Sequence, residues 1–522
     1  MRMTVSMREV VCLSLAVVGL PCLVSGATKD MANVSAQYHS AGCVQLTGNT
    51  NLSALKKVLA VPSAAGIQRL ALERISGLLA DGLNLGTNMS AASLIEPLLS
   101  DAVETESLGS FGASATNALD FVLALRLDAT RAQLWHDNFV KLFGNTAEKF
   151  TAEEFNGWRW KIGASDSFWI VLARDWLVVG RGDDLLPVQS EYLRRLSRDG
   201  RPGPALTDNW LEADLDCQRL AAWLPDWLQL SRPARIKIAI AEQTNNLHMT
   251  ARVVYPEPIP WKSGSWQIPA GLVSGPLVSF TAGQNIAPFL NLGPPFSRLN
   301  DNPLTNQFYV WAQSGWPFLT YVAWPATNVT NALNELSTNA TALFNPELKQ
   351  FNGTELVWQP NRKKIALANL RVIMPDLGAV QDKSGEFLLA SLFPRGRAKQ
   401  AVPDDLWTPI QGRTNLVYYD WELTGPRLQE WRIPGRMLLT RWREPTDDVT
   451  EARIYEDKWL DEVARLNDNS STTTTEITRV EANELSVIRN SPVGLTGVEV
   501  FLIFNWLSVA DARPNVSQPA VH

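Results

Sequence analysis

Three short patterns in this chain resemble the motifs of acylating serine enzymes. Ser53-Ala54-Leu55-Lys56 matches the S-x-x-K signature, in which a lysine helps to activate the serine. Ser337-Thr338-Asn339 and Lys383-Ser384-Gly385 resemble the other two boxes of those enzymes. The second and third boxes lie in the other half of the chain from the first, and each pattern is short enough to occur by chance. The sequence therefore favours a helix start at Ser53 and a polar turn at Lys383 over a catalytic site.

The histidines do not form a metal site in the sequence. His39, His136, His248 and His522 are far apart, and only His39 lies near a cysteine of the mature chain, Cys43. Zinc sites need several such ligands at close spacing, so we expect no metal. The chain has no phosphate-binding glycine loop, and we expect no cofactor. A hydrolase, for instance one acting on glycans, with a site between two repeats of the chain remains an alternative.

Tryptophan is unusually frequent, with twenty residues against eight tyrosines. Trp158 and Trp160 stand two apart, so they share one face of an expected strand. Trp261 and Trp266 lie in a segment rich in proline, glycine and serine. Exposed indole rings can stack on sugars or form a partner interface, whereas buried rings fill a core. We expect burial for most tryptophans and take these four as candidate ligand-binding residues.

The first 26 residues have the order of a secretory signal peptide. Arg2 and Arg8 precede the apolar stretch Val10–Val24, and the small residues Ser25 and Gly26 follow it. This stretch is shorter than the roughly twenty residues that span a bilayer. The sequence therefore predicts a cleaved signal and a periplasmic or secreted protein.

Two cysteines remain after removal of the signal, Cys43 and Cys217. An oxidising compartment would allow them to form a disulfide. Two unpaired thiols fit the sequence equally well, because the sequence gives no distance between them.

The charge and hydropathy of the mature chain exclude two classes of partner. The formal net charge of the full sequence is −6, loss of Arg2, Arg8 and Glu9 with the signal makes it about −7, and no basic block occurs, which argues against nucleic acid. No segment after the signal is long enough to span a membrane. The best candidate, Val498–Val509, contains Glu499 and is interpreted as a buried strand.

The chain resembles itself at an offset of nearly two hundred residues. Phe121–Leu134 and Phe318–Asn331 both begin with an apolar run and reach an Ala-Thr pair. Four further matches follow in the same order: Ile95–Leu99 with Ile286–Leu290, Phe155–Gly157 with Phe351–Gly353, Asn209 and Asp214 with Asn415 and Asp420, and Leu247 with Leu485. This order indicates a tandem duplication with insertions in the second copy.

The expected elements define an α+β fold in which hairpin-linked strands form antiparallel sheets with helices between them. We expect a polar leader and short N-terminal helices over residues 27–90, a first α+β repeat over 91–275, a second over 276–510 and a polar tail over 511–522. The short helical segment precedes the two repeats in this prediction.

Two segments suggest a relationship to known proteins. Trp176–Gly180 ends an expected hairpin, and Ser491–Gly497 precedes an apolar segment. In these features the chain resembles large exported bacterial proteins of unknown function, a group that supplies no catalytic residue to carry over. We therefore expect an exported, non-enzymatic binding or envelope-associated scaffold with a protein or glycan partner. Carbohydrate binding through loop tryptophans is a further alternative.

Overall fold

The structure is a computed structural model that describes residues 34–44, 53–82, 89–113, 119–162, 167–182, 186–206, 208–220, 233–261, 264–285, 306–314, 319–350, 354–369, 374–393, 400–430, 451–466 and 472–508. The expected signal peptide at 1–26, the tail at 511–522 and the segment Ile286–Leu290 lie outside these ranges. The described residues combine helices with antiparallel strands, which confirms the α+β class.

All described strands belong to a single antiparallel sheet of twenty strands. Ten come from the first half of the chain: β1 (Ala36–Ser40), β2 (Ser107–Ala113), β3 (Leu119–Arg126), β4 (Glu148–Ala152), β5 (Phe155–Lys161), β6 (Ser167–Ala173), β7 (Trp176–Arg181), β8 (Asn209–Asp216), β9 (Arg235–Gln243) and β10 (Asn246–Val254). Ten come from the second half: β11 (Leu277–Gln284), β12 (Gln307–Gln313), β13 (Thr320–Pro325), β14 (Glu355–Gln359), β15 (Lys364–Ala368), β16 (Asp376–Asp382), β17 (Gly385–Ser391), β18 (Leu416–Leu423), β19 (Thr472–Glu481) and β20 (Glu484–Ser491).

The two halves of the sheet have the same strand order. From the outer end to the centre the first half runs β4-β5-β6-β7-β3-β2-β1-β8-β9-β10. The second half runs β14-β15-β16-β17-β13-β12-β11-β18-β19-β20. Each strand of the first half thus has a counterpart ten strands later. Even a register shift recurs, between Asn209 and Leu211 in β8 and between Leu416 and Tyr418 in β18.

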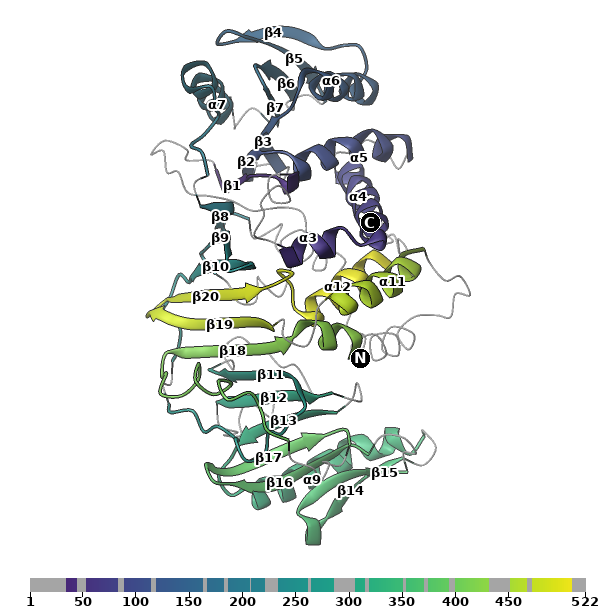
Figure 1. The fold of residues 1–522 in the computed structure, drawn as a ribbon, viewed down its shortest axis with the longest axis vertical. Coiled ribbons are helices and arrows are strands. Elements are labelled where there is room, and N and C mark those ends of the chain that lie inside the picture. Colours follow the sequence, from purple (N-terminus) through teal and green to yellow (C-terminus); the bar gives the residue numbers. More distant parts are fainter. Residues whose placement is uncertain are drawn as a thin grey trace, which may run out of the picture.

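The halves join through main-chain pairing of β10 with β20 at the centre of the sheet (Figure 1). Thr250 faces Ile488 across this pairing, and each is the fifth residue of its strand. The pairing is symmetric about these two residues, so the strand pattern has an approximate two-fold axis there. The halves therefore form one continuous sheet and not two lobes around a groove.

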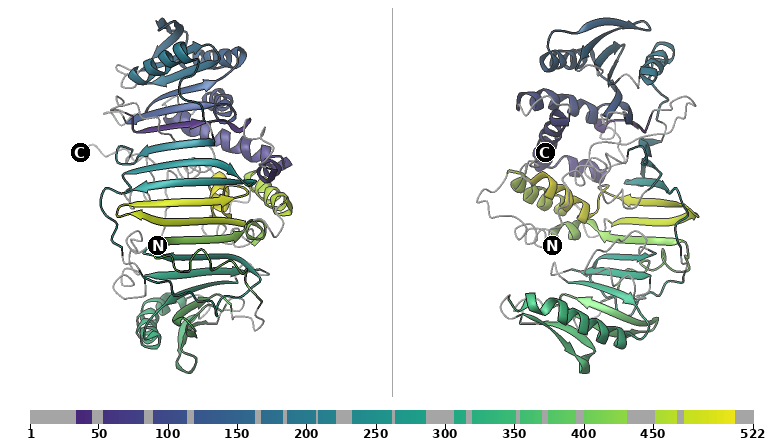
Figure 2. Two further views of the ribbon diagram at one scale, coloured as in Figure 1. Left: turned by 60° about the vertical axis from the view of Figure 1, so that its left-hand side comes forward. Right: turned by 180° about the vertical axis from the view of Figure 1, so that it is seen from behind.

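Helices cover both faces of the sheet (Figure 2). We call the face that carries Leu177 and Val179 the inner face, because Trp135 and Phe139 of α6 (Ala129–Phe143) cover it and the sheet curves toward that side. Other helices lie on the same side, among them α9 (Val329–Leu348), α11 (Glu451–Leu466) and α12 (Gly497–Ser508). The opposite, outer face is covered near one end by α7 (Leu186–Asp199) and in the second half by residues 400–412. None of the described helices has both the length and the apolar character needed to cross a bilayer.

The prediction of a polar leader ahead of the N-terminal helices is wrong for Ala36–Ser40, because these residues form a strand of the sheet. Ala36–Ser40 forms β1, which pairs on one side with β2 and on the other with β8. Three helices follow β1: α3 (Ser53–Leu59), α4 (Pro62–Gly82) and α5 (Met89–Glu104). The polar composition of Ala36–Ser40 hid a short strand, because its stability comes from two neighbours that are distant in sequence.

The prediction of a buried strand at Val498–Val509 is also wrong, because Gly497–Ser508 forms α12. Thr496 and Glu499 make a reciprocal capping box: Glu499 N donates to Thr496 Oγ1 at 3.3 Å, and Thr496 N donates to Glu499 Oε2 at 2.8 Å. An apolar run does not by itself distinguish a buried strand from a buried helix. The T-x-x-E pattern was the signal that decides it.

Most of the sequence matches between the halves do not coincide with the structural equivalence. Ala129-Thr130 begins α6, whereas Ala326-Thr327 precedes the first residue of α9. Phe155 begins β5, whereas 351–353 lie ahead of β14, the counterpart of β4, outside the described residues.

Strand pairing shows that two further sequence matches between the halves are wrong by one residue and that one is correct. Asp214 aligns with Trp421, and Asp420 lies on the inner face while Asp214 lies on the outer face. A one-residue slip places side chains on opposite faces of a sheet. The same slip makes Leu416, and not Asn415, the counterpart of Asn209. Leu247 and Leu485 do correspond, since each is the second residue of its strand.

The strands at the two ends of the sheet, β4 and β14, are protected differently. β4 carries the exposed charges Glu148 and Lys149, which discourage pairing with another chain. On β14 the main-chain N–H and C=O of Leu356 are hydrogen-bonded by a side chain of α9. Asn345 accepts from Leu356 N at 2.7 Å and donates to Leu356 O at 3.1 Å, so one unit of this edge is blocked.

Substituting Asn345→Ala should expose this edge and promote self-association. Loss of two hydrogen bonds should also lower the free energy of unfolding by about 1–2 kcal/mol. Light scattering over a concentration series measures the first effect and urea unfolding measures the second. Thr341→Ala is the matched control, because Thr341 donates only within its own helix. Equal association of both variants would show that Asn345 does not protect the edge.

Candidate functional site

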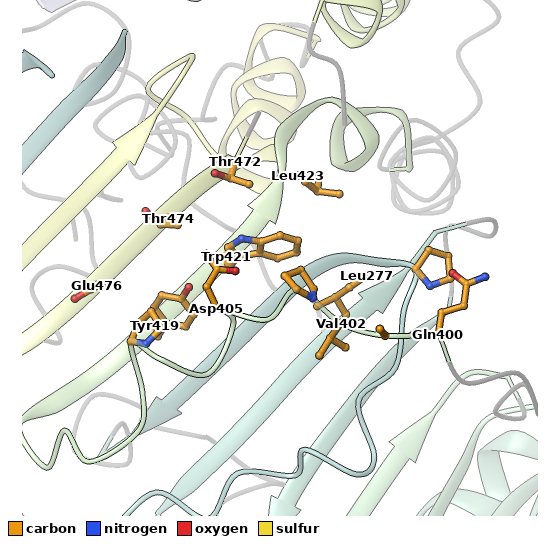
Figure 3. Close-up of a pocket in the computed structure, with 14 residues that line it drawn as sticks. Leu277, Gln400, Val402, Asp405, Tyr419, Trp421, Leu423, Thr472, Thr474 and Glu476 are labelled. Carbon is orange, nitrogen blue, oxygen red and sulfur yellow. The ribbon is translucent and has the colours of Figure 1, made fainter. Parts of the chain in front are cut away.

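A pocket of about 730 Å³ opens on the outer face of the second half (Figure 3). Its floor is formed by alternate residues of β18, namely Tyr419, Trp421 and Leu423. Its apolar wall comes from Pro276, Leu277, Val402, Pro403 and Pro409. The site is therefore built where residues 400–409 cross the sheet and leave β18 and β19 partly uncovered.

The polar side chains of the pocket are acidic or uncharged. Thr472, Thr474 and Glu476 project from β19, and Asp405 comes from the crossing segment. Glu476 Oε2 accepts from Arg413 Nη1 at 2.7 Å. Within the part of the chain that the structure describes, the carboxylate of Asp405 has no hydrogen-bond or ion-pair partner.

The two carboxylates lie near the phenol of Tyr419. Burial raises the pKa of the Tyr419 hydroxyl, and the negative charges of Glu476 and Asp405 raise it further. The pocket thus combines an aromatic and aliphatic lining with a negative potential. Arrangements of this kind bind uncharged or cationic groups better than anions.

At the equivalent place in the first half, two long basic side chains stand on β9, the strand that corresponds to β19. Strand pairing makes Arg235 and Lys237 the counterparts of Thr472 and Thr474. Arg235 makes a two-pronged ion pair with Asp214, and Lys237 Nζ lies 3.6 Å from the same carboxylate. The pocket therefore arises where the second half carries short hydroxyl side chains.

A second polar cluster lies behind β18 on the inner face, beneath α12. Glu422 and Asp420 are 3% and 9% exposed, which places two carboxyl groups in the interior. Asp420 Oδ1 accepts from Thr281 Oγ1 at 2.6 Å, and Glu422 Oε1 accepts from the first N–H of α12, on Gly497, at 2.9 Å. Arg489 binds Glu499 of α12 through two bonds of 2.9 Å each.

Burial dominates the protonation of these groups. Burial raises the pKa of Glu422 to about 8, with a further contribution from the charge of Asp420. Burial also raises the pKa of Asp420 and lowers that of Arg427. Since α12 covers this cluster and its groups bond to one another, the arrangement anchors the helix to the sheet.

Of the four predicted ligand-binding tryptophans, Trp160 cannot contact a ligand in this structure. Trp160 is 1% exposed, and its Nε1 donates to Gly144 O at 3.0 Å. Trp158, on the same face of β5, is half-buried with its ring 4.5 Å from that of His136. The two rings therefore pack against α6 as part of the inner-face core.

Trp261 and Trp266 lie in the segment between β10 and β11, away from the other pair. Trp261 packs beneath the guanidinium of Arg479 at 5.5 Å. Trp266 donates to Arg413 O at 3.0 Å and meets Tyr309 edge-on. Trp261 and Trp266 are both half-buried, and none of the four predicted tryptophans lines the pocket. The tryptophan that does, Trp421, carried no sequence signal, because it stands in an ordinary strand.

The disulfide that the sequence allowed is not formed, since Cys43 and Cys217 are free thiols. Ala41 N donates to Trp210 O, which places Cys43 near the start of β8, whereas Cys217 follows its end. Strand residues advance about 3.3 Å each, so the thiols are separated by roughly 20 Å or more. A disulfide requires α-carbons within about 7 Å. Burial raises the pKa of Cys43 to about 11 and that of Cys217 to about 12.

The three boxes of the serine-enzyme pattern are not brought together. Ser53 begins α3 near the middle of the molecule, Ser337 lies in α9, and Lys383 lies in the turn between β16 and β17 (Figure 1). Asp382 accepts from Ser384, which supports the polar turn expected there. Among the described residues no group of histidine, cysteine and carboxylate side chains has the geometry of a metal site.

Comparison with known protein families, with curated proteins and with solved structures gives no match to this chain.

The buried carboxyl of Glu422 makes stability depend on pH. Its pKa rises from the ordinary 4.5 to about 8, so between these values the folded protein holds more protons than the unfolded chain. Stability should therefore fall as the pH rises through this window. Glu422→Gln keeps the acceptor oxygen and removes the charge, and should stabilise the protein at pH 8 by on the order of 3 kcal/mol.

Urea unfolding at pH 5 and pH 8 measures this effect. Glu481→Gln, at an exposed position on β19, is the matched control and should leave the pH dependence unchanged. If Glu422→Gln leaves the difference between the two pH values intact, Glu422 is not the group that titrates.

Proposed function

We propose that this chain is an exported, non-enzymatic binding scaffold and that the outer-face pocket is its ligand site. The main supporting observation is that the pocket of the second half is lined by the short side chains Thr472 and Thr474, at the positions where the first half carries Arg235 and Lys237. A pocket of this volume, with a buried aromatic floor, an apolar wall and several polar side chains, suits ligand binding.

We further propose that the two halves derive from a tandem duplication. The recurrence of ten strands in one order, with a register shift at the same place, supports a common origin. On this proposal the first half kept the basic residues Arg235 and Lys237, while the second half acquired threonines at these positions and, with them, the pocket. The export and the periplasmic or secreted location rest on the signal-like start of the sequence.

The arrangement of the pocket favours binding over catalysis. Glu476 is engaged by Arg413, and no histidine or cysteine lines the pocket among the described residues. The rival is a hydrolase that uses Asp405 and Glu476 as its pair of carboxylates, since glycoside hydrolysis needs two such groups facing one substrate. The envelope-associated role and a glycan partner remain compatible with the pocket.

A thermal-shift screen tests the pocket as the ligand site. The probes are maltoheptaose, chitotetraose, arginine amide and spermidine. A probe at a hundred times its Kd stabilises the folded protein by about 2.7 kcal/mol, which is a measurable shift in Tm. Thr474→Trp should fill the pocket and abolish that shift. Thr250→Trp, at the centre of the same face, is the matched control and should preserve it.

Two results would contradict the proposal. A probe whose shift is the same in wild type and Thr474→Trp binds outside the pocket. Sustained turnover of generic ester, glycoside or peptide substrates that is lost in Asp405→Asn or Glu476→Gln would establish the hydrolase instead.

A further inference from the structure

Resting on the function proposed above, we infer that the pocket takes a basic aliphatic group, namely an ammonium or guanidinium on a flexible stem. The ligand would be a free polyamine or basic amino acid, or an arginine or lysine side chain of a peptide. In either case the charged end lies near Asp405 and the stem lies along the apolar wall.

The first half shows which side chains the fold accommodates at the position equivalent to the pocket. Lys237 and Arg235 extend over the strand that corresponds to β18, and both pair with Asp214. These side chains consist of an aliphatic stem and a cationic head. In the first half they belong to the chain itself, so no ligand is needed to place a cation there. In the second half Thr474 and Thr472 stand at their positions, so the stems and the cations are missing there.

The pocket of the second half is acidic, as the equivalent position of the first half is, although it lacks the basic side chains. Asp214 has no acidic counterpart at its own position, which is Trp421, but Asp405 and Glu476 line the same pocket. Arg413 compensates Glu476, whereas Asp405 has no partner within the described part of the chain. Asp405 is exposed at the mouth of the pocket, so its carboxylate is open to a cation from outside.

The rest of the lining fits the stem of such a ligand. Leu277, Val402 and Pro409 offer an apolar wall, against which methylene groups can lie while the head stays polar. Trp421 is 7% exposed and Tyr419 3% exposed, so neither shows the broad ring face that stacking on a sugar needs. Their edges leave room for a narrow chain. No lysine, arginine or histidine lines the pocket among the described residues, which disfavours anionic ligands.

Isothermal titration with a matched pair of probes tests the charge requirement. Arginine amide and citrulline amide have nearly the same shape, but only the first carries a cation. Wild type should bind arginine amide at least about tenfold more tightly, and the preference should shrink as salt is raised. Asp405→Asn should reduce the affinity for arginine amide about tenfold and leave that for citrulline amide unchanged.

Placing the lysine of the first half at the equivalent position of the second half tests directly whether the pocket accepts a basic side chain. Thr474→Lys should fill the pocket with its own cation and abolish binding of arginine amide. Thr250→Lys adds the same charge to the same face away from the pocket, and should bind as wild type does. Circular dichroism of both variants checks that they are folded.

Two further probes distinguish the source of the cation. Tighter binding of a blocked Gly-Gly-Arg-Gly-Gly peptide than of arginine amide supports a protein segment, and tighter binding of spermidine supports a free polyamine. Equal affinities for arginine amide and citrulline amide overturn the inference, as does unchanged binding in Thr474→Lys. Maltoheptaose binding that Thr474→Trp abolishes, without preference for a cation, would overturn this inference and leave the pocket as a binding site. Binding that no pocket variant alters would overturn both.

Discussion

From Leu247 to Val254 β10 pairs with β20, and this ladder turns two ten-strand arrangements into one sheet. The inner side reinforces the same junction, because residues of α4 from the first half share a hydrophobic cluster with α11 and α12 from the second. Since the ladder fixes register by main-chain hydrogen bonds, it also fixes which positions of the two halves correspond. The position of every other strand follows from this central pair outward, including β18 and β19, which carry the pocket.

Two faces of one strand serve different purposes in β18. Tyr419 and Trp421 form the floor of the pocket on the outer face, while Asp420 and Glu422 point inward to the capped end of α12. The alternation of side chains in a strand makes this separation possible within four residues. It also links the two sides, because the acidic residues that anchor α12 alternate with the residues that form the floor of the pocket.

Several local signals in the sequence predict the local structure, although the capping box of α12 was missed, whereas contacts between distant segments carry no such signal. Asp128, a residue type that favours helix N-caps, caps α6 with its Oδ1 accepting from Arg131 N at 2.9 Å, and the β9–β10 hairpin turns at the polar pair Thr244 and Asn245. β1 was missed because both of its partners are far along the chain. The pocket had no motif to find, since Asp405, Trp421 and Thr474 come together only through the register of β18 with β19. The replacement of Arg235 and Lys237 by threonines becomes visible only once that register is known.

The place of β10 in the chain has a consequence for how the molecule is made. One side of β10 pairs with β9 directly across a short turn, but its other side must wait for β20, close to the end of the described chain. Until then the first half presents a long, unprotected edge of nine residues. Such an edge invites pairing with another copy, and the symmetric register would accept a second β10 in the place of β20. During synthesis the chain must therefore avoid its own homodimer, and a fragment ending after Val254 would form that dimer through the same strand.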